Sequence, residues 1–142
     1  MIEICFVCTG NTCRSIMAER IAKKMAKSKN IGDIKFSSAG IYASGENIAE
    51  NAQIALKRTG YDGRNRKSVK LNKTKPNVLY ITVTNDHKKF LNSKKVLSFE
   101  EFANKVLDPY GQSIEVYLKT ISVLEQNIKI LLEKIENLRG VL

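Results

Sequence analysis

The sequence is poor in the residues that build metal sites and disulfide frameworks. It contains three cysteines, Cys5, Cys8 and Cys13, and a single histidine, His87. Three cysteines in one short stretch make a poor disulfide framework, and no second pair completes a zinc-type ligand set. A metal site is not expected with one histidine either. The sequence therefore predicts chemistry that needs no metal and no cofactor.

Long apolar runs and prolines are also scarce. The chain has two prolines, no low-complexity tract and 43% hydrophobic residues, which leaves little room for a disordered segment. No apolar run approaches the length of a membrane span, and the N-terminus lacks the build of a signal peptide. We expect one domain over residues 1–142, located in the cytoplasm and without a membrane partner.

Acidic residues are outnumbered by basic ones. The chain has 14 Asp and Glu against 24 Lys and Arg, a formal net charge of +10. Such a surface can steer phosphorylated or acidic partners to a site, or it can bind nucleic acid. The lysines are spread over residues 23–29, 70–75 and 88–95, with no aromatic-rich RNA-binding motif among them. This spread favours a compositional bias of the source genome, and we expect no nucleic-acid partner.

The order of the apolar segments indicates an α/β fold. Short apolar runs predict strands, and apolar stripes with a repeat of three or four residues predict helices. Because the two alternate, we expect a parallel sheet that binds ligands beyond the carboxyl ends of its strands. Strands are predicted at Ile2–Val7, Asp33–Ser38, Val78–Val83 and Lys95–Ser98, and helices at Ser15–Lys27, Ile48–Thr59, Glu100–Asn104 and Ser113–Leu138. The stripe of the last helix is expected to face the core rather than a coiled-coil partner.

One stretch carries the chemistry: Cys8-Thr9-Gly10-Asn11-Thr12-Cys13-Arg14-Ser15, directly after the first predicted strand. A buried strand that ends in a Gly-containing loop and then a helix directs backbone N–H groups at one small volume, which favours an anion. The same field stabilises a thiolate at Cys8, the candidate nucleophile. Arg14 has the planar fork that binds two phosphate oxygens. The pattern Cys-x5-Arg-Ser therefore predicts a phosphatase.

These residues resemble the signature of the low-molecular-weight protein phosphatase family. The match consists of Val7–Ser15 with Met17-Ala18-Glu19, then Ser38-Ala39-Gly40, and then Asp108-Pro109-Tyr110-Gly111 near the C-terminus. It runs over essentially the whole chain in the expected order. The resemblance implies a phosphotyrosine protein phosphatase I-like fold, which is a three-layer α/β sandwich with a four-stranded parallel sheet. It also implies phosphorylated protein substrates.

The resemblance further implies a role for each site residue. Cys8 attacks phosphorus and forms a phosphocysteine, Arg14 and the amides of residues 9–15 neutralise the phosphate oxygens, and Asp108 protonates the leaving group and then activates water. The sequence alone also allows Asp108 to begin an ordinary Asp-Pro turn. The expected phosphate-binding residues are Thr9, Gly10, Asn11, Thr12, Cys13 and Ser15.

Two features concern the substrate. Tyrosine phosphatases of the family usually carry an aliphatic residue where this chain has Thr12, whereas the bacterial protein-arginine-phosphatase branch carries threonine. The stretch Asp108–Tyr117 also resembles that branch. We therefore expect hydrolysis of protein phosphoarginine by a monomer, with a protein-tyrosine phosphatase as the alternative. The absence of any cysteine after Cys13 argues strongly against a thioredoxin-coupled arsenate reductase, and the three catalytic residues together disfavour a purely binding module.

Three residues near the loop leave questions open. Ser15 can cap the helix or hydrogen-bond to Cys8. Cys13 can form a reversible disulfide with Cys8 or pack beneath the loop. Where the family has a histidine in a His-x-Ser element, this chain has Arg66, and the rigidity of the loop is then in question.

The remaining candidates lie outside the loop. The connection Arg64–Pro76 is predicted to face solvent, and His87 is interpreted as a surface histidine. Tyr42 and Tyr110 are candidate walls of the cleft, with core packing as the alternative for Tyr42. Cys5 is expected to face the core as a small hydrophobic residue.

Overall fold

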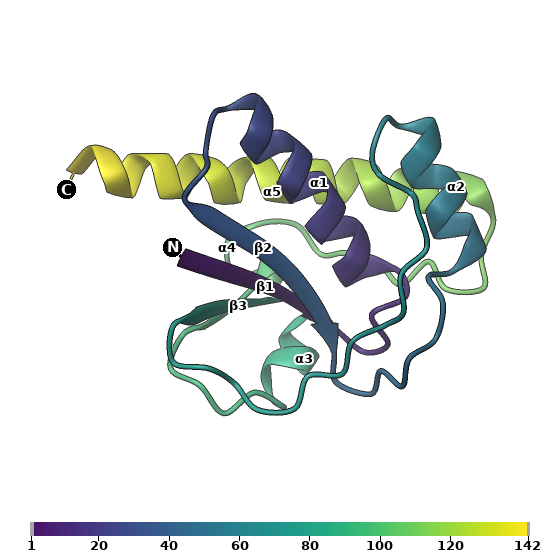
Figure 1. Ribbon diagram of the computed structural model, residues 1–142, viewed down its shortest axis with the longest axis horizontal. Helices are drawn as coiled ribbons and strands as arrows, with labels where there is room; N and C mark the ends of the chain where they lie inside the picture. The colour runs from purple at the N-terminus through teal and green to yellow at the C-terminus, as the bar shows by residue number, and fades with distance from the viewer. Residues whose placement is uncertain (1, 142) are drawn as a thin grey trace.

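The computed structural model describes residues 2–141, with side chains described as far as residue 137. Figure 1 shows strands and helices alternating along most of the chain. The elements in order are β1 (Ile2–Cys8), α1 (Arg14–Ser28), β2 (Ile34–Gly40), α2 (Glu50–Arg58), β3 (Val78–Thr82), α3 (Asn85–Lys88), β4 (Val96–Ser98), α4 (Phe99–Phe102) and α5 (Ile114–Val141).

The four strands form one parallel sheet in the order β2-β1-β3-β4. The central strand β1 is buried along most of its length, as its continuous apolar run predicts. Its register pairs Cys8 with Gly40 of β2 and Val7 with Thr82 of β3. The carboxyl ends of these strands therefore meet at one edge, and Cys8 lies there. The predicted four-stranded parallel α/β fold is confirmed.

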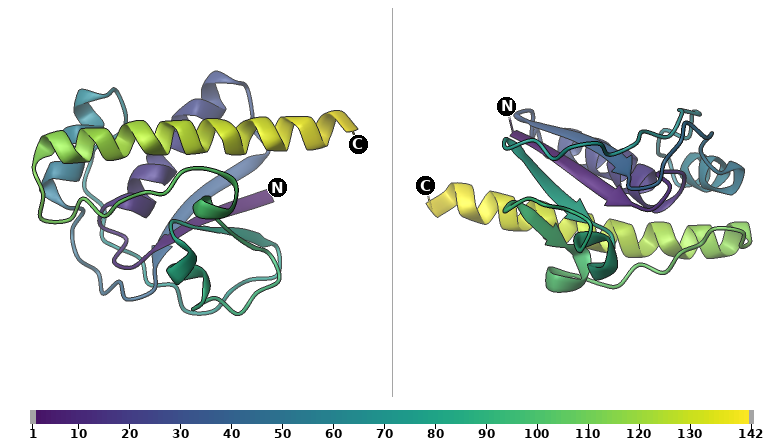
Figure 2. Two further views of the ribbon diagram at one scale, coloured as in Figure 1. Left: turned by 180° about the vertical axis from the view of Figure 1, so that it is seen from behind. Right: turned by 90° about the horizontal axis from the view of Figure 1, so that it is seen from below.

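The larger core lies between the sheet and the long helix α5. Views from two sides show α5 crossing behind α1 and α2 (Figures 1 and 2). Its apolar stripe is buried in this core, as predicted for a core-facing helix: Tyr117, Ile121, Leu124, Ile128 and Leu131. Phe6 of β1 stacks between Phe36 and Phe99 in the same core. A helix packed in this way holds α1, and with it the end of the anion loop, at a fixed height above the sheet.

A smaller apolar cluster covers the opposite face of the sheet. It contains Cys5, Val7 and Tyr80, with Leu71 and Leu91 packed against it from loops. Burial raises the pKa of the Cys5 thiol to about 11, so this cysteine stays protonated at neutral pH. The prediction that Cys5 faces the core is confirmed.

The predicted element bounds hold to within one to three residues, the largest difference being at the end of α5, and one element was omitted. The short helix α3 follows β3 and was not predicted. It begins with a capping box in which the Thr84 side chain accepts a hydrogen bond from the His87 amide. In the described part of the chain, no helix combines the length and apolar character that crossing a membrane requires.

Candidate active site

The loop between β1 and α1 is fixed by hydrogen bonds that neighbouring segments donate to its carbonyl groups. The Cys8 and Thr9 carbonyls accept hydrogen bonds from the amides of Ile41 (3.0 Å) and Tyr42 (2.9 Å), and the Thr12 carbonyl accepts one from Ala49 (3.0 Å). In a trans peptide the next N–H points the opposite way from the carbonyl. The amides that follow these carbonyls are therefore turned into the loop, where they form an anion-binding nest.

Gly40 permits the loop to approach the sheet closely. A Cβ atom at this position would lie 2.7 Å from the Thr9 oxygen and 2.8 Å from the Asn11 nitrogen. Both contacts are to backbone, which cannot move aside without distorting the loop. The glycine of the Ser38-Ala39-Gly40 segment is thus required by close packing against the loop.

Cys8 is buried, and two groups point at its sulfur. The Asn11 amide donates a hydrogen bond to Cys8 Sγ over 3.3 Å, and Ser15 Oγ lies 2.9 Å from the same sulfur. Hydrogen bonds directed at sulfur stabilise negative charge on it. Because α1 begins at Arg14 with Cys13 at the cap position, the interpretation of Ser15 as a helix cap is wrong, and its hydroxyl contacts the thiol instead.

Asn11 connects the loop to the body of the protein. It has a positive φ of 57°, a conformation that asparagine tolerates better than most residues. Its Nδ2 donates to Ser15 Oγ (2.8 Å) and to Ser38 Oγ (3.0 Å). Its Oδ1 accepts from the Val69 amide (3.0 Å) and from Arg66 Nη2 (2.8 Å). All the polar atoms of its amide are therefore fixed by neighbours.

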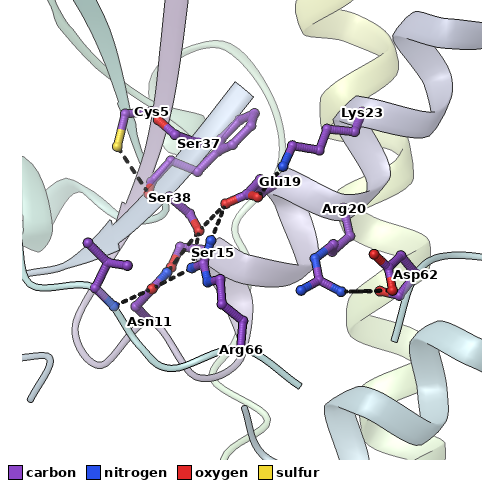
Figure 3. Close-up of polar contacts among 12 residues, drawn as sticks. Cys5, Asn11, Ser15, Glu19, Arg20, Lys23, Ser37, Ser38, Asp62 and Arg66 are labelled. Atoms are coloured by element: carbon purple, nitrogen blue, oxygen red, sulfur yellow. Dashed lines mark hydrogen bonds and ion pairs between the residues drawn. The ribbon is translucent and has the colours of Figure 1, made fainter. Parts of the chain in front are cut away.

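Arg66 replaces the family's histidine without loosening the loop. Figure 3 shows its guanidinium in the middle of the network, where Nη2 donates to Asn11 and to Ser38 Oγ (3.1 Å) and Nη1 donates to Glu19 (2.9 Å). The prediction that residues 64–76 only face solvent is wrong for Arg66, which is half-buried. The planar fork reaches three partners at once, which a single imidazole cannot do.

Glu19 supplies the buried carboxylate of this network. Burial alone would raise its pKa, but hydrogen bonds from Lys23 and Ser38 and the charge of Arg66 hold the pKa below its ordinary value. Glu19 therefore stays ionised at neutral pH. A buried carboxylate on α1 requires cationic partners, and the connection from α2 to β3 provides one in Arg66.

His87 was predicted to lie on the surface, and this is wrong. The side chain is buried, with Nε2 2.9 Å from Thr9 Oγ1. Its Nδ1 accepts from the Thr84 amide over 3.3 Å, which leaves Nε2 as the donor in the neutral ring. Burial, and then the nearby Arg14 charge, lowers the pKa of His87. A neutral imidazole thus fixes Thr9 from the side of β3, because α3 begins at the same edge of the sheet as the loop.

The predicted catalytic residues meet in one cavity of about 420 Å³. Arg14 is buried at its inner end, where Nη1 donates to the Val106 carbonyl (3.1 Å). Asp108 lies at the mouth with 57% of its side chain exposed, and its Oδ2 is 3.7 Å from Arg14 Nη2. The cavity is lined by Cys8, Thr9, Gly10, Thr12, Cys13, Arg14, Glu46, Asn47, Ala49, Asp108 and Tyr110.

The two predicted wall tyrosines differ. Tyr110 lines the cavity and is exposed. Tyr42 is not among the lining residues and is not in the core either. It is 64% exposed and packs edge-on against Phe90. The prediction that Tyr42 forms a wall, and its core alternative, are both wrong for this structure.

Cys13 packs beneath the loop with its thiol free. Its Sγ lies 3.2 Å from the Tyr117 hydroxyl. Burial raises the pKa of Cys13, which keeps it a thiol. The packing interpretation of Cys13 therefore describes this structure, while reversible bridging to Cys8 remains a prediction.

Sequence reasoning left the role of Arg66 open and missed the contacts of Arg66 and His87 with the loop. It also missed Glu46 and Asn47 in the cavity wall. One signal was available for His87, since it follows directly on a strand whose carboxyl end lies beside the loop. Within the described part of the chain, no three His, Cys, Asp or Glu side chains gather as metal ligands.

A parallel sheet with a thiol-containing anion loop at its carboxyl edge is the architecture of the small cysteine-dependent phosphatases. The sequence matches the family of low molecular weight phosphotyrosine protein phosphatases over residues 3–139. The chain belongs to this family and is a protein phosphatase.

The relatives fall into two kinds. The protein-arginine-phosphatase of Bacillus subtilis (strain 168) is 31% identical over 147 residues, covering 95% of this chain and 97% of that protein. The low molecular weight protein-tyrosine-phosphatase PtpB of Staphylococcus haemolyticus is 32% identical over 133 residues, covering 87% and 92%. A solved structure of the YwlE arginine phosphatase, a cysteine-to-serine mutant with a phosphorylated active-site serine, superposes with a TM-score of 0.83. It is 29% identical and covers 95% of this chain and 96% of that one.

Proposed function

We propose that this phosphatase hydrolyses phosphoarginine in proteins, with Cys8 as the nucleophile. The observation that supports this reaction is the arrangement of three groups in one cavity. A thiol that receives hydrogen bonds lies at its base, a buried guanidinium lies beside it, and a carboxyl group lies at the mouth. The phosphorylated serine in the YwlE mutant supports an enzyme-bound phosphoryl group at the position of Cys8.

The first step transfers the phosphoryl group to sulfur. The Cys8 thiolate attacks phosphorus, the S–P bond forms, and the P–N bond to the arginine side chain breaks. Arg14 and the inward amides of the loop neutralise the three equatorial oxygens. Asp108 donates its proton to the leaving nitrogen. The arginine side chain of the substrate then leaves as a neutral guanidine rather than as an anion.

The second step regenerates the enzyme. Asp108, now a carboxylate, removes a proton from water, and the hydroxide attacks the phosphocysteine. The S–P bond breaks, inorganic phosphate leaves, and the Cys8 thiolate is restored. Ser15 Oγ, at 2.9 Å, stabilises this leaving sulfur.

The preference for phosphoarginine is supported by the cavity wall. Thr12 lines the cavity, and it is smaller and more polar than the aliphatic residue of the tyrosine enzymes. Glu46 lines the same cavity, and hydrogen bonds from Ser44 lower its pKa to about 2. The mouth therefore carries two carboxyl groups, Glu46 and Asp108, which suit a planar, partly cationic substrate group better than a phenol ring.

A protein-tyrosine phosphatase is the second candidate, supported by Tyr110 at the mouth and by the 32% identity to PtpB. The two are separated by kcat/KM on phosphoarginine and phosphotyrosine in the same peptide sequence. We expect a higher value for phosphoarginine, with measurable cross-activity. A higher value for phosphotyrosine would reject the proposal in favour of the second candidate.

Cys8→Ser tests the nucleophile. We expect turnover to fall by at least about 10⁴-fold on both substrates, while orthovanadate or phosphate still binds, because the loop amides and Arg14 remain. Appreciable turnover by the variant would remove Cys8 from the mechanism.

We further propose that residues 1–142 act as one phosphatase domain, as a monomer and in the cytoplasm. Sedimentation and cell fractionation test these last two points.

A further inference from the structure

A second cavity, of about 450 Å³, shares no lining residue with the active site. All seven of its lining residues are charged: Glu19, Arg20, Lys23, Lys24, Lys27, Asp62 and Arg66. Five are cations and two are carboxylates, so the lining carries a net charge of +3 (5 − 2). Such an excess attracts an anion with several negative charges.

Both carboxylates of the cavity are already occupied. The Glu19 carboxylate is shared by Lys23 (2.6 Å) and Arg66 (2.9 Å). Asp62 pairs with Arg64 (3.0 Å) and lies 3.3 Å from Arg20. Two cations therefore divide each carboxylate, and neither carboxylate can neutralise the remaining lysines.

The cations lie on one face of α1 because of their spacing. Arg20, Lys24 and Lys27 follow at intervals of four and three residues, and Lys23 and Lys27 are four apart. Like charges at these intervals repel each other and destabilise a helix. A bound anion would convert this repulsion into attraction.

Two guanidinium groups form the less exposed part of the cavity. Figure 3 shows Arg20 joined to Asp62, and Arg66 joined to Glu19 and Asn11. Arg20 is only 9% exposed, so its guanidinium is held in place before any ligand arrives. Arg66 Nε is buried and has no acceptor among the described residues. Among the described residues the Arg20 guanidinium contacts Asp62 through Nη1 alone, which leaves its other N–H groups for phosphate oxygens at little entropic cost.

From these observations we infer that this cavity is a second anion site, which binds a chain of linked phosphate groups such as inorganic tripolyphosphate or the triphosphate of a nucleotide. The cavity is as large as the active-site cavity and has cations along two turns of α1. A linear polyanion matches this row better than one phosphate does. The site lies directly behind the phosphate loop, since the Arg66 guanidinium that lines it also donates to Asn11. The inference does not depend on the substrate proposed above.

The test is a calorimetric titration of sodium tripolyphosphate into the wild-type protein saturated with orthovanadate, at fixed ionic strength. We expect one binding event that vanadate does not remove. The double substitution Lys24→Gln with Lys27→Gln should weaken it at least tenfold. The matched control is Lys119→Gln with Lys134→Gln, which removes the same charge from two exposed lysines on α5. This control should change the affinity less than twofold.

Two further measurements complete the test. A circular dichroism spectrum and melting curve of each variant show that it is folded, and tripolyphosphate should raise the melting temperature of the wild type but not of the Lys24/Lys27 variant. ATP in place of tripolyphosphate distinguishes the source of the ligand. Tighter binding of ATP indicates a nucleotide, whereas equal or weaker binding indicates that the site recognises only the phosphate chain. Loss of binding in vanadate, equal weakening by both double variants, or no binding would each overturn the inference.

Discussion

The base and the mouth of the active-site cavity are built in opposite ways. The base is supported by Asn11, Ser15, Ser38 and Glu19, which do not line the cavity themselves. Each of them is no more than 4% exposed and has at least two hydrogen-bond or ion-pair partners. At the mouth, Tyr110 is 70% exposed, and Asp108 is held by a hydrogen bond from the Tyr110 amide (3.1 Å) and a 3.7 Å contact to Arg14. The base is preorganised for a phosphate group, whose shape is the same in every substrate. The mouth meets the part of the substrate that varies.

This contrast has a kinetic consequence. Changes at the base should affect all substrates by similar factors, because the phosphoryl group is common to them. Changes at the mouth should affect substrates unequally, according to the leaving group or the shape of the side chain. The variants below test this division in order of decreasing effect.

Asp108→Asn should show the largest dependence on the leaving group. An amide cannot donate a carboxyl proton, so we expect kcat to fall roughly 10²–10⁴-fold for substrates with poor leaving groups. Activated aryl phosphates, whose leaving group needs no proton, should lose far less. The measurement is a plot of log kcat against leaving-group pKa for both proteins. Parallel lines would mean that Asp108 positions the site and is not the acid.

The active site also shows which parts of a site can be predicted from a sequence. Cys8, Arg14 and the intervening amides belong to one loop of fixed length, so their meeting is decided locally. The strands were predicted from apolar runs, and Asp108 was identified through the resemblance of Asp108-Pro109-Tyr110-Gly111 to the family's acid loop. The structure brings these residues together in one cavity, and their catalytic roles stay predictions.

Arg66 and His87 could not be predicted in the same way. Their partners, Asn11 and Thr9, lie 55 and 78 residues away in sequence, so the contacts depend on how the connections pack at the sheet edge. Arg66 lies in a basic, polar segment, and such segments are usually solvated. What makes it different is the buried carboxylate of Glu19, and neither periodicity nor composition shows that this carboxylate faces the connection.

Thr12→Ile changes the wall of the cavity without touching the nucleophile. The added methyl and methylene groups fill space beside a planar guanidinium and offer an aromatic ring a packing surface. We expect the ratio of kcat/KM for phosphoarginine to that for phosphotyrosine to fall roughly 10- to 200-fold, about 1–3 kcal/mol. The matched control is Thr74→Ile, which changes a half-buried threonine that does not line the cavity. An unchanged ratio in Thr12→Ile would show that this wall does not select the substrate.

Arg66→His tests the base through a change in pH dependence. A histidine at this position bonds to Glu19 as a cation only below its own pKa, whereas arginine stays charged at all relevant pH values. We expect the variant to keep most activity at low pH and to lose roughly tenfold in kcat as the pH rises through that pKa. The loss corresponds to about 1.5 kcal/mol for a hydrogen bond to a charged group. It should be equal for phosphoarginine and phosphotyrosine, because Arg66 acts through Asn11.

Two variants control the Arg66 experiment. Lys70→His places an imidazole on an exposed residue of the same connection, and it should leave the pH profile as in the wild type. Arg66→Lys keeps the charge without the fork, and it should lower kcat without adding a titration. A pH profile of Arg66→His identical to that of Arg66→Lys would show that the charge at this position does not control the loop.

The smallest effect concerns His87, which holds Thr9 at the junction of base and sheet. Because burial and the Arg14 charge lower its pKa in the folded protein from 6.5, the unfolded chain takes up this proton at a higher pH than the folded one. The contribution of His87 to stability is therefore complete above pH 6.5 and is lost as the pH falls through the folded-state pKa. One proton gives a slope of at most about 1.4 kcal/mol per pH unit. His87 is the single histidine of the chain, and the lowered carboxylate pKa values of Glu19 and Asp62 place their titration at more acidic pH.

Urea unfolding of the wild type between pH 5 and 7 should show this slope, and His87→Asn should remove it while lowering the free energy of unfolding at pH 7. Equal slopes in the two proteins would mean that the imidazole is protonated alike in both states, and that the Thr9 contact does not depend on a neutral ring.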